Sequence, residues 1–173
     1  QHPQAAVITA KAWAGKHYAV YGLARSGLAT VRALLASGGR VTAWDDREEA
    51  RATLVEEVRS SRAKSRDLGP HSRRRPSTSL GTNGFEFVDL NTADLTPFDY
   101  LIVSPGVPLN THPLAARARA ANLEIIGDIE LFARARPELP PHKVVGITGT
   151  NGKTTTTALV HHILKTAGVP TTM

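Results

Sequence analysis

The fold is decided by residues 17–46, which read HYAVYGLARSGLATVRALLASGGRVTAWDD. The first five residues form a short apolar run typical of a buried strand, and a glycine-rich turn follows from Gly22 to Gly27. A helix ending near Ser37 is predicted by apolar residues at helical spacing, namely Leu28, Val31, Leu34 and Leu35. A second strand is expected over Arg40–Trp44. This order of strand, turn, helix and strand is the beginning of a parallel sheet.

The same alternation continues to about residue 136. A polar helix is predicted from Arg47 to about Val58, and a helix that begins after Gly127 takes Asp128 as its N-cap. The other predicted elements are strands over 85–88, 100–103 and 124–126 and a helix over 113–121. Together they predict an α/β domain over residues 17–136, with a Rossmann-like parallel sheet and flanking helices.

Two segments mark the limits of this domain. Residues 1–16 show no clear hydrophobic periodicity and are predicted to be a ragged N-terminus. Three prolines at 137, 140 and 141 predict a stiff linker over 137–142. A second domain then begins with a strand over 143–148 and a helix over 153–167. The chain starts with Gln1 and stops at Met173 directly after that helix, so we expect both ends to be cut and the second domain to be truncated.

Residues 59–84 differ in composition from the rest of the chain. They hold seven basic residues, one acid and six serines, with only Leu68 and Leu80 as large aliphatics. This segment therefore carries the whole net charge of +6, and the remainder has 14 basic and 14 acidic residues. Such a composition predicts a disordered insertion, because it offers too little apolar surface to pack. A nucleic-acid site is disfavoured, since the charge belongs to one segment.

Composition excludes several other classes of protein. Hydrophobic residues make up 41% and charged residues 21%, as in a globular protein, and no apolar run is long enough to span a bilayer. The first residues do not show the pattern of a secretory signal, so none is predicted from them. The absence of cysteine rules out disulfides and thiolate chemistry and fits a reducing cytoplasm. The histidines indicate no metal site, because His161 and His162 are adjacent and point to different sides of a helix.

The strongest functional pattern is GITGTNGKTT at residues 146–155. A strand that runs into a glycine turn and then a helix directs backbone N–H groups and the helix dipole at a phosphate. Lys153 can reach the terminal phosphates, and the Thr154 hydroxyl can bind Mg²⁺. The predicted ATP site is Gly149, Thr150, Asn151, Gly152, Lys153, Thr154 and Thr155. Ile147 stands where the common loop has its first glycine, so an incidental glycine-rich helix start is the alternative.

A second candidate site lies at the turn over 22–27. Its spacing resembles a dinucleotide fingerprint, although Ala24 replaces one glycine. Ser104-Pro105-Gly106 follows another predicted strand, and the carboxyl ends of parallel strands form the ligand crevice of such sheets. The candidate contacts to a nucleotide sugar are Arg25, Ser26, Asp46, Arg47, Ser104 and Gly106. A tight strand-to-helix turn without a ligand is the alternative.

These motifs resemble the Mur ligase family. The loop at 148–155 is similar to the ATP-binding motif of Mur ligases and of folylpolyglutamate synthase, but about 140 residues precede it here, unlike in the synthase. Three further stretches, 21–27, 103–108 and 126–132, resemble the D-glutamate-adding members. The last of them, IGDIELF, is the most discriminating. The resemblance covers residues 17–58 and 85–173 and has no counterpart for 59–84.

The resemblance implies a three-domain, ATP-dependent and Mg²⁺-dependent ligase of peptidoglycan precursor synthesis. Its substrates are UDP-N-acetylmuramoyl-L-alanine and D-glutamate, and its mechanism passes through an acyl phosphate. Lys153 and Thr154 are then catalytic, and Thr154 is the metal ligand. The family's carboxylated lysine, its other metal ligands and its D-glutamate site are expected beyond Met173. We expect a cytoplasmic monomer that binds neither nucleic acid nor membrane, and no ligase activity in these 173 residues alone.

Three other functions remain open on the sequence. One is a non-catalytic Rossmann-type module that binds a nucleotide sugar. Another is a Mur ligase with a different amino-acid substrate. The third is a nucleic-acid binder that uses the basic segment. Completion of an ATPase sheet and addition of an amino-acid domain in the remainder of the gene distinguish the ligases from the binding module.

Overall fold

The computed structural model describes residues 7–66 and 84–171. Its chain separates into two compact units, Gln1–Leu139 and Pro140–Met173. Each unit is described by itself.

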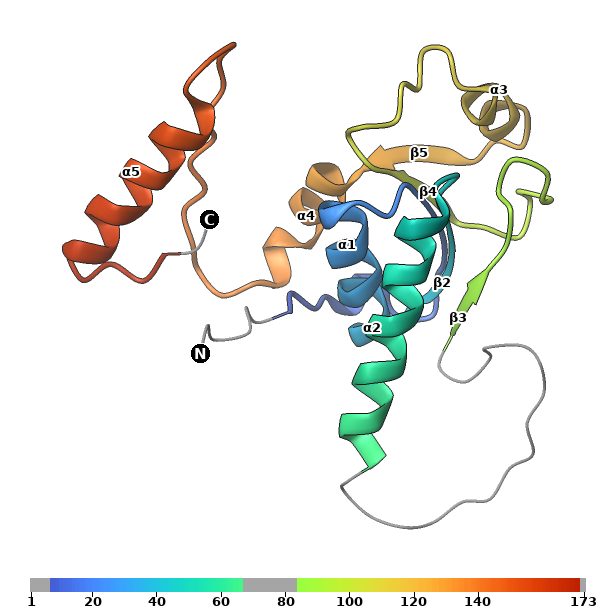
Figure 1. Ribbon diagram of the computed structural model, residues 1–173, viewed down its shortest axis with the longest axis horizontal. Helices are drawn as coiled ribbons and strands as arrows, with labels where there is room; N and C mark the ends of the chain where they lie inside the picture. The colour runs from blue at the N-terminus through green and yellow to red at the C-terminus, as the bar shows by residue number, and fades with distance from the viewer. Residues whose placement is uncertain (1–6, 67–83, 172–173) are drawn as a thin grey trace. The chain divides into compact units, whose positions relative to one another are not determined.

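The first unit is built on a five-stranded parallel sheet (Figure 1). Its strands are β1 (His17–Tyr21), β2 (Arg40–Trp44), β3 (Phe85–Phe87), β4 (Tyr100–Val103) and β5 (Glu124–Gly127), in the order β3-β2-β1-β4-β5. Tyr21, the last residue of β1, pairs with Trp44 and with Val103, so three strands end level with one another. The predicted α/β Rossmann-like fold is confirmed.

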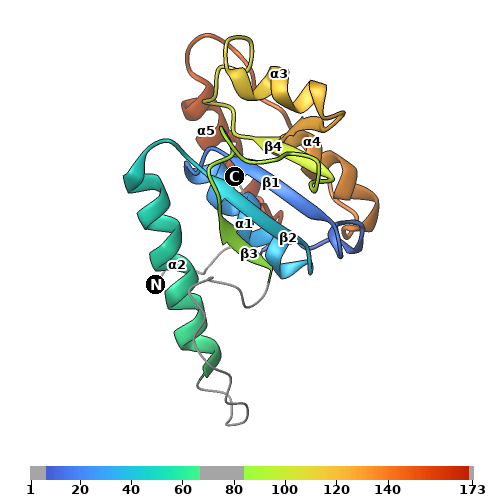
Figure 2. The same ribbon diagram turned by 90° about the vertical axis from the view of Figure 1, so that its right-hand side faces the viewer.

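Alternate residues of β1 serve two cores, because successive side chains of a strand point to opposite faces. Tyr18 and Val20 belong to a cluster that α1 (Arg25–Ala36), α2 (Glu48–Arg66) and α4 (Asp128–Ala135) cover. Ala19 and Tyr21 belong to a second cluster, which α3 (Pro113–Ala120) covers. The sheet therefore lies between two layers, with α1 and α3 on opposite faces (Figure 2).

The segment before β1 belongs to the core, so the predicted ragged N-terminus is wrong for residues 7–16. A short 3-10 helix, η1 (Lys11–Trp13), places the Trp13 side chain in the α1 cluster, where it is 4% exposed. The backbone N–H groups of Lys11 and Ala12 donate to the Glu138 carboxylate in η2 (Arg136–Glu138). The packing of Trp13 and the carboxylate of Glu138 hold this segment, and neither contact produces a periodic pattern of apolar residues in the sequence.

Helix α2 is longer than predicted. It runs to Arg66, so the predicted insertion begins too early and residues 59–66 are helical. Arginine, lysine and alanine are good helix formers, and no strong breaker occurs before Gly69-Pro70. Residues 67–83 of the predicted insertion lie outside the described residues. The described residues continue at Gly84, whose carbonyl accepts a hydrogen bond from the backbone N–H of Val41.

Two helix starts also differ from the prediction. Helix α1 begins at Arg25 rather than Leu28, so the glycine turn passes directly into the helix. Helix α4 begins at Asp128 itself, and Gly127 is its N-cap. The Asp128 carboxylate accepts from the N–H of Ile129 at 2.8 Å and therefore does not act as the predicted cap.

The second unit contains one helix, α5 (Lys153–Thr166), among its described residues. The prediction of a strand over 143–148 is wrong for this structure, because these residues pair with no described strand. A strand is stabilised by its hydrogen-bonded neighbours and is marginal without them. The local pattern was sufficient for the helix but not for the strand.

Candidate functional site

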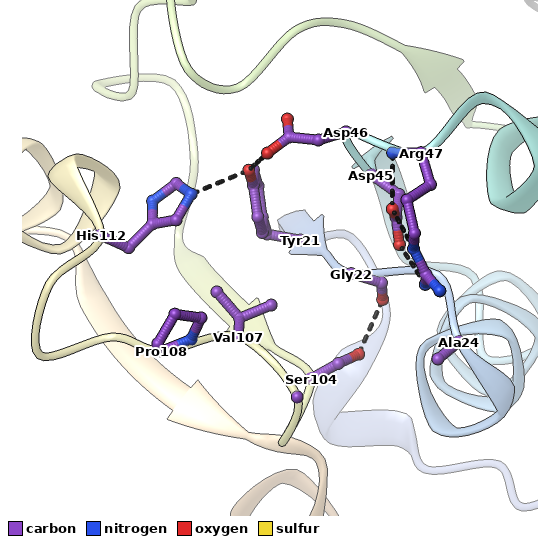
Figure 3. A pocket seen from close by; sticks show the side chains of 11 residues that line it. Tyr21, Gly22, Ala24, Asp45, Asp46, Arg47, Ser104, Val107, Pro108 and His112 are labelled. Atoms are coloured by element: carbon purple, nitrogen blue, oxygen red, sulfur yellow. Dashed lines mark hydrogen bonds and ion pairs between the residues drawn. The ribbon is translucent and has the colours of Figure 1, made fainter.

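A pocket of about 460 Å³ lies at the level carboxyl ends of β1, β2 and β4 (Figure 3). This is the edge at which open parallel sheets bind ligands. Four of the six predicted nucleotide-sugar contacts line it, namely Asp46, Arg47, Ser104 and Gly106. The other lining residues are Tyr21, Gly22, Ala24, Asp45, Val107, Pro108 and His112.

The turn beside the pocket contains two glycines that no larger residue can replace without movement. Gly22 has φ of +92°, and a Cβ there would lie 2.9 Å from the Cβ of Ser104. A Cβ on Gly27 would lie 1.9 Å from the Gly22 carbonyl oxygen. The Ser104 hydroxyl donates to that same oxygen at 2.7 Å. The turn therefore packs closely against both α1 and the end of β4. The Ser104 hydroxyl has no further hydrogen to donate to a ligand.

Asp45 ties the turn to the end of β2. Its Oδ2 accepts from the N–H of Leu23 at 2.7 Å, and its Oδ1 accepts from the Arg47 N–H at 2.9 Å. Arg47 Nε and Nη2 also donate to the two oxygens, each at 3.1 Å. Burial opposes ionisation of Asp45, but the hydrogen bonds from Arg47 and Leu23 outweigh it and lower the pKa of the carboxyl. Asp45 thus holds the turn and fixes Arg47 at the pocket.

Asp46 presents an ionised carboxylate at the pocket wall. Tyr21 Oη donates to its Oδ2 at 2.6 Å, while Trp44 Nε1 and Asn91 Nδ2 donate to its Oδ1 at 3.1 and 2.8 Å. The hydrogen bond from Tyr21 is the largest cause that lowers the pKa of Asp46. Burial and the same hydrogen bond raise the pKa of Tyr21, so its hydroxyl stays protonated. Three donors from three segments fix this negative charge in place.

His112 completes the wall and was missed by the sequence analysis. It is the N-cap of α3, where its Nδ1 accepts from the N–H of Leu114 at 3.2 Å. Its Nε2 lies 3.0 Å from Tyr21 Oη, and the two rings meet edge to face at 4.9 Å. The available signal was its position directly before Pro113, because proline is favoured at the first position of a helix. Tyr21 and Asn91 were also missed as site residues, since their contacts join distant segments.

The N-terminus of α1 faces the pocket through Ala24. Ala24 is the N-cap of α1 and makes no side-chain capping hydrogen bond. The first backbone N–H groups of a helix have no partner within it and favour an anion. The predicted contacts Arg25 and Ser26 lie in this first turn but are not among the residues that line the pocket.

The second candidate site is the loop before α5. Gly152 is its N-cap in the left-handed conformation, with φ of +76°, and no side chain caps this helix either. The Lys153 ammonium donates to the Gly149 carbonyl oxygen at 2.5 Å. All seven predicted ATP contacts, residues 149–155, are exposed. The glycine turn, the uncapped helix start and the lysine together fit a phosphate group.

A metal at this loop would have few protein ligands. The described parts of the chain hold no group of three or more His, Cys, Asp or Glu side chains that could bind a metal ion. The predicted ligand Thr154 lies in the first turn of α5 and is exposed. Its hydroxyl fits Mg²⁺ only together with phosphate oxygens and water, which is how a phosphate loop binds this ion.

Among the described residues, no helix is both long enough and apolar enough to cross a bilayer.

No protein-family model matches the chain. Its similar curated proteins, in contrast, share one name. It is 56% identical over 167 residues to the UDP-N-acetylmuramoylalanine–D-glutamate ligase of Sphingopyxis alaskensis, a match that covers 96% of this chain and 32% of that protein. The ligase of the same name from Novosphingobium aromaticivorans is 51% identical, over 95% of this chain and 31% of the relative. That of Zymomonas mobilis is 46% identical, over 96% and 35%. The chain spans about a third of the length of these curated relatives.

Proposed function

Because this chain belongs to the family of UDP-N-acetylmuramoylalanine–D-glutamate ligases, we propose that the intact protein joins D-glutamate to UDP-N-acetylmuramoyl-L-alanine at the expense of ATP. The observation that carries the proposal is the 56% identity over 96% of the chain, which includes both candidate sites. The chain contributes the nucleotide-sugar pocket and the phosphate loop. The D-glutamate site belongs to the part of the protein outside these residues.

The polarity of the pocket supports an orientation for the nucleotide sugar. Asp46 is ionised and repels phosphate, whereas the lone pair that remains on its Oδ2 attracts an N–H or O–H donor of the ligand. The first turn of α1, which follows Ala24, supplies backbone N–H groups without a partner inside the helix on another side of the pocket. The diphosphate is therefore proposed to lie towards α1 and Gly106, with the hydrogen-bond donors of the ligand towards Asp46.

Arg47 supplies positive charge to this pocket without leaving Asp45. Its Nε and Nη2 point at the Asp45 carboxylate, which fixes the plane of the guanidinium. Ser104 serves differently, because its hydrogen is given to Gly22 and only its oxygen lone pairs remain for a ligand. Arg25 and Ser26, at the first turn of α1, are proposed as outer contacts to the same diphosphate.

The phosphate loop is proposed to hold ATP for the transfer step. The N–H groups of the loop and of the first turn of α5 would bind phosphate oxygens, and Lys153 would leave the Gly149 carbonyl to contact the terminal phosphates. Thr154 and the phosphates would hold Mg²⁺, which would neutralise negative charge on the phosphates. The alanyl carboxylate of the sugar nucleotide attacks the γ-phosphorus and releases ADP. The D-glutamate amine then attacks the acyl carbon, loses a proton and displaces phosphate.

We propose a monomer that works in the cytoplasm without nucleic acid or membrane, consistent with a chain that has no cysteine and balanced charge outside residues 59–84.

The test is the dependence of ATP consumption on the two other substrates. The intact protein should release ADP only when UDP-N-acetylmuramoyl-L-alanine and D-glutamate are both present. Replacing D-glutamate by L-lysine or diaminopimelate should abolish the reaction. Turnover with either of these amino acids, but not with D-glutamate, would assign the protein to another branch of the family.

A further inference from the structure

We propose that His112 is a positioning residue for the nucleotide-sugar pocket: it directs the single hydrogen of the Tyr21 hydroxyl to Asp46 and so fixes the carboxylate that the ligand meets. The inference rests on the proposed function for what the pocket binds. It rests on the hydrogen bonds of the chain itself for how the wall is held.

The tautomer of His112 follows from its two contacts. Nδ1 accepts the Leu114 N–H, which is a backbone donor and cannot accept in return. A neutral imidazole that accepts at Nδ1 carries its hydrogen on Nε2. Nε2 lies 3.0 Å from Tyr21 Oη, so the imidazole donates to the phenol oxygen. His112 is therefore a donor towards the pocket and an acceptor towards α3.

This direction decides where the Tyr21 hydrogen goes. Tyr21 has one hydrogen and three polar neighbours, at 2.6 Å (Asp46 Oδ2), 3.0 Å (His112 Nε2) and 3.3 Å (Asn91 Oδ1). With its hydrogen on Nε2, the imidazole cannot accept from the hydroxyl. It also polarises the phenol, which strengthens the bond that the phenol donates. The hydroxyl is thereby committed to Asp46.

A histidine is an unusual means of capping α3. Ser, Thr, Asp and Asn are the favoured N-caps, and any of them would satisfy the Leu114 N–H. None of them would also reach the Tyr21 hydroxyl with a second nitrogen held at a fixed angle to the first. The choice of histidine thus joins the start of α3 to the end of β1, and through Tyr21 to Asp46 after β2.

His112→Asn is the informative variant, because asparagine keeps an acceptor for the Leu114 N–H and removes only the contact with Tyr21. Tyr21→Phe removes the hydroxyl and keeps the ring. The double variant completes a cycle. His162→Asn, an exposed histidine on α5, is the matched control for the substitution itself. Melting temperatures of all forms verify that they are folded.

The first readout needs no ligand. Nitrogen-15 spectra of the 173-residue chain should show that His112 carries its hydrogen on Nε2 and none on Nδ1. The Tyr21 hydroxyl proton should be protected from exchange with solvent, and this protection should be lost in His112→Asn. The second readout is the dissociation constant for UDP by calorimetry. We expect each single variant to weaken UDP by about fivefold and the double variant by no more than either, since one hydrogen-bonded path is removed in all three.

In the intact protein the same variants should raise KM for the sugar nucleotide and leave kcat at saturation unchanged. A hydrogen on Nδ1, losses that add in the double variant, or UDP affinity unchanged by His112→Asn would each overturn the proposal. Failure of every form to bind UDP would refute the proposed nucleotide site instead. Survival of the protected Tyr21 hydroxyl proton in His112→Asn would in that case still overturn the positioning role.

Discussion

Two segments of this molecule share one sequence pattern and reach different structures. Residues 17–36 and 143–166 each run from an apolar stretch through a glycine turn into a helix. In the first unit the apolar stretch is β1, paired with both β2 and β4, and α1 buries Val31 and Leu34 completely. In the second unit residues 143–148 pair with no described strand, and no residue of α5, all of which are described, is buried.

The difference shows what a local pattern can decide. Helix α5 forms because its hydrogen bonds lie within the segment, and its side chains at 159 and 163 remain 56% and 55% exposed. A strand gains its hydrogen bonds from other segments, so the pattern at 143–148 has no effect without them. We propose that the first unit binds the sugar nucleotide by itself, whereas residues 149–155 bind ATP only when residues 143–148 are paired in a sheet.

The largest effect that separates the units is expected from Lys153→Ala in the intact protein. Loss of the ammonium should lower kcat by about 10⁴-fold, because charge neutralisation dominates phosphoryl transfer. The dissociation constant for UDP-N-acetylmuramoyl-L-alanine should remain within about twofold of the unsubstituted protein's value, as expected for a surface substitution away from the pocket. Lys165→Ala, at the other end of α5, is the control and should change neither quantity. An equal loss of sugar-nucleotide affinity in Lys153→Ala would contradict the assignment of the two sites to separate units.

Alanine at a glycine in each unit should give a large difference in stability. Gly27→Ala places a Cβ 1.9 Å from the Gly22 carbonyl oxygen and should cost on the order of 4 kcal/mol. Gly146→Ala meets nothing within 4 Å and should leave stability within about 0.5 kcal/mol. Urea unfolding followed by fluorescence reports the first unit, because both tryptophans, Trp13 and Trp44, lie in it. Similar midpoints for the two variants would refute the close packing of the turn.

Truncation of a leucine in each helix should separate the units by a smaller amount. Leu34→Ala in α1 removes a fully buried side chain and should cost about 3 kcal/mol. Leu159→Ala in α5 removes a side chain that is 56% exposed and should cost less than about 0.5 kcal/mol in the 173-residue chain. The same urea experiment measures the first, and helical circular dichroism measures the second. A large loss of helix signal in Leu159→Ala would mean that α5 is packed, against our interpretation.

The smallest effect is a pH dependence confined to the first unit. Burial, followed by the Arg40 charge, lowers the pKa of His17, whose Nε2 lies 2.9 Å from the Thr42 hydroxyl. As pH falls through the ordinary value of 6.5, the unfolded chain takes up a proton that the folded chain resists. The free energy of unfolding should therefore have its full value above pH 6.5 and decrease as the pH falls below it.

His17→Gln should flatten this decrease between pH 7 and pH 5, because the amide can still donate to Thr42 but does not titrate in that range. His162→Gln, in the exposed part of α5, should leave the slope as it is. A slope that His17→Gln does not change would show that another group causes it.

The order of elements followed directly from the sequence, and the contacts of the pocket did so only in part. Apolar period and glycine turns place all five strands of the sheet, since both are local signals. Four of six expected pocket residues line the pocket because the ends of parallel strands meet at one edge. The links from Tyr21 to Asn91 and to His112 join residues 70 and 91 positions apart, and no local signal encodes them.

Two other features were missed, the first because of contacts distant in the sequence and the second because helix propensity was given too little weight. The segment before β1 is held by the packing of Trp13 and by the carboxylate of Glu138, which accepts from the N–H of Ala12, 126 positions away. Neither contact produces a periodic pattern in the sequence. The predicted end of α2 was wrong because a run rich in serine and arginine has few apolar residues and was therefore predicted to be disordered. Helix propensity, which tolerates arginine, lysine and alanine, decided it instead.

The most direct test of the account is a pair of calorimetric titrations of the 173-residue chain. One uses UDP-N-acetylmuramoyl-L-alanine, and the other uses ATP with Mg²⁺. We predict saturable binding of the sugar nucleotide, weakened by Arg47→Ala at the pocket, and no tight Mg²⁺-dependent binding of ATP. Tight Mg²⁺-dependent binding of ATP, or a sugar nucleotide that does not bind, would contradict the proposal that the first unit binds its ligand alone and that residues 149–155 do not.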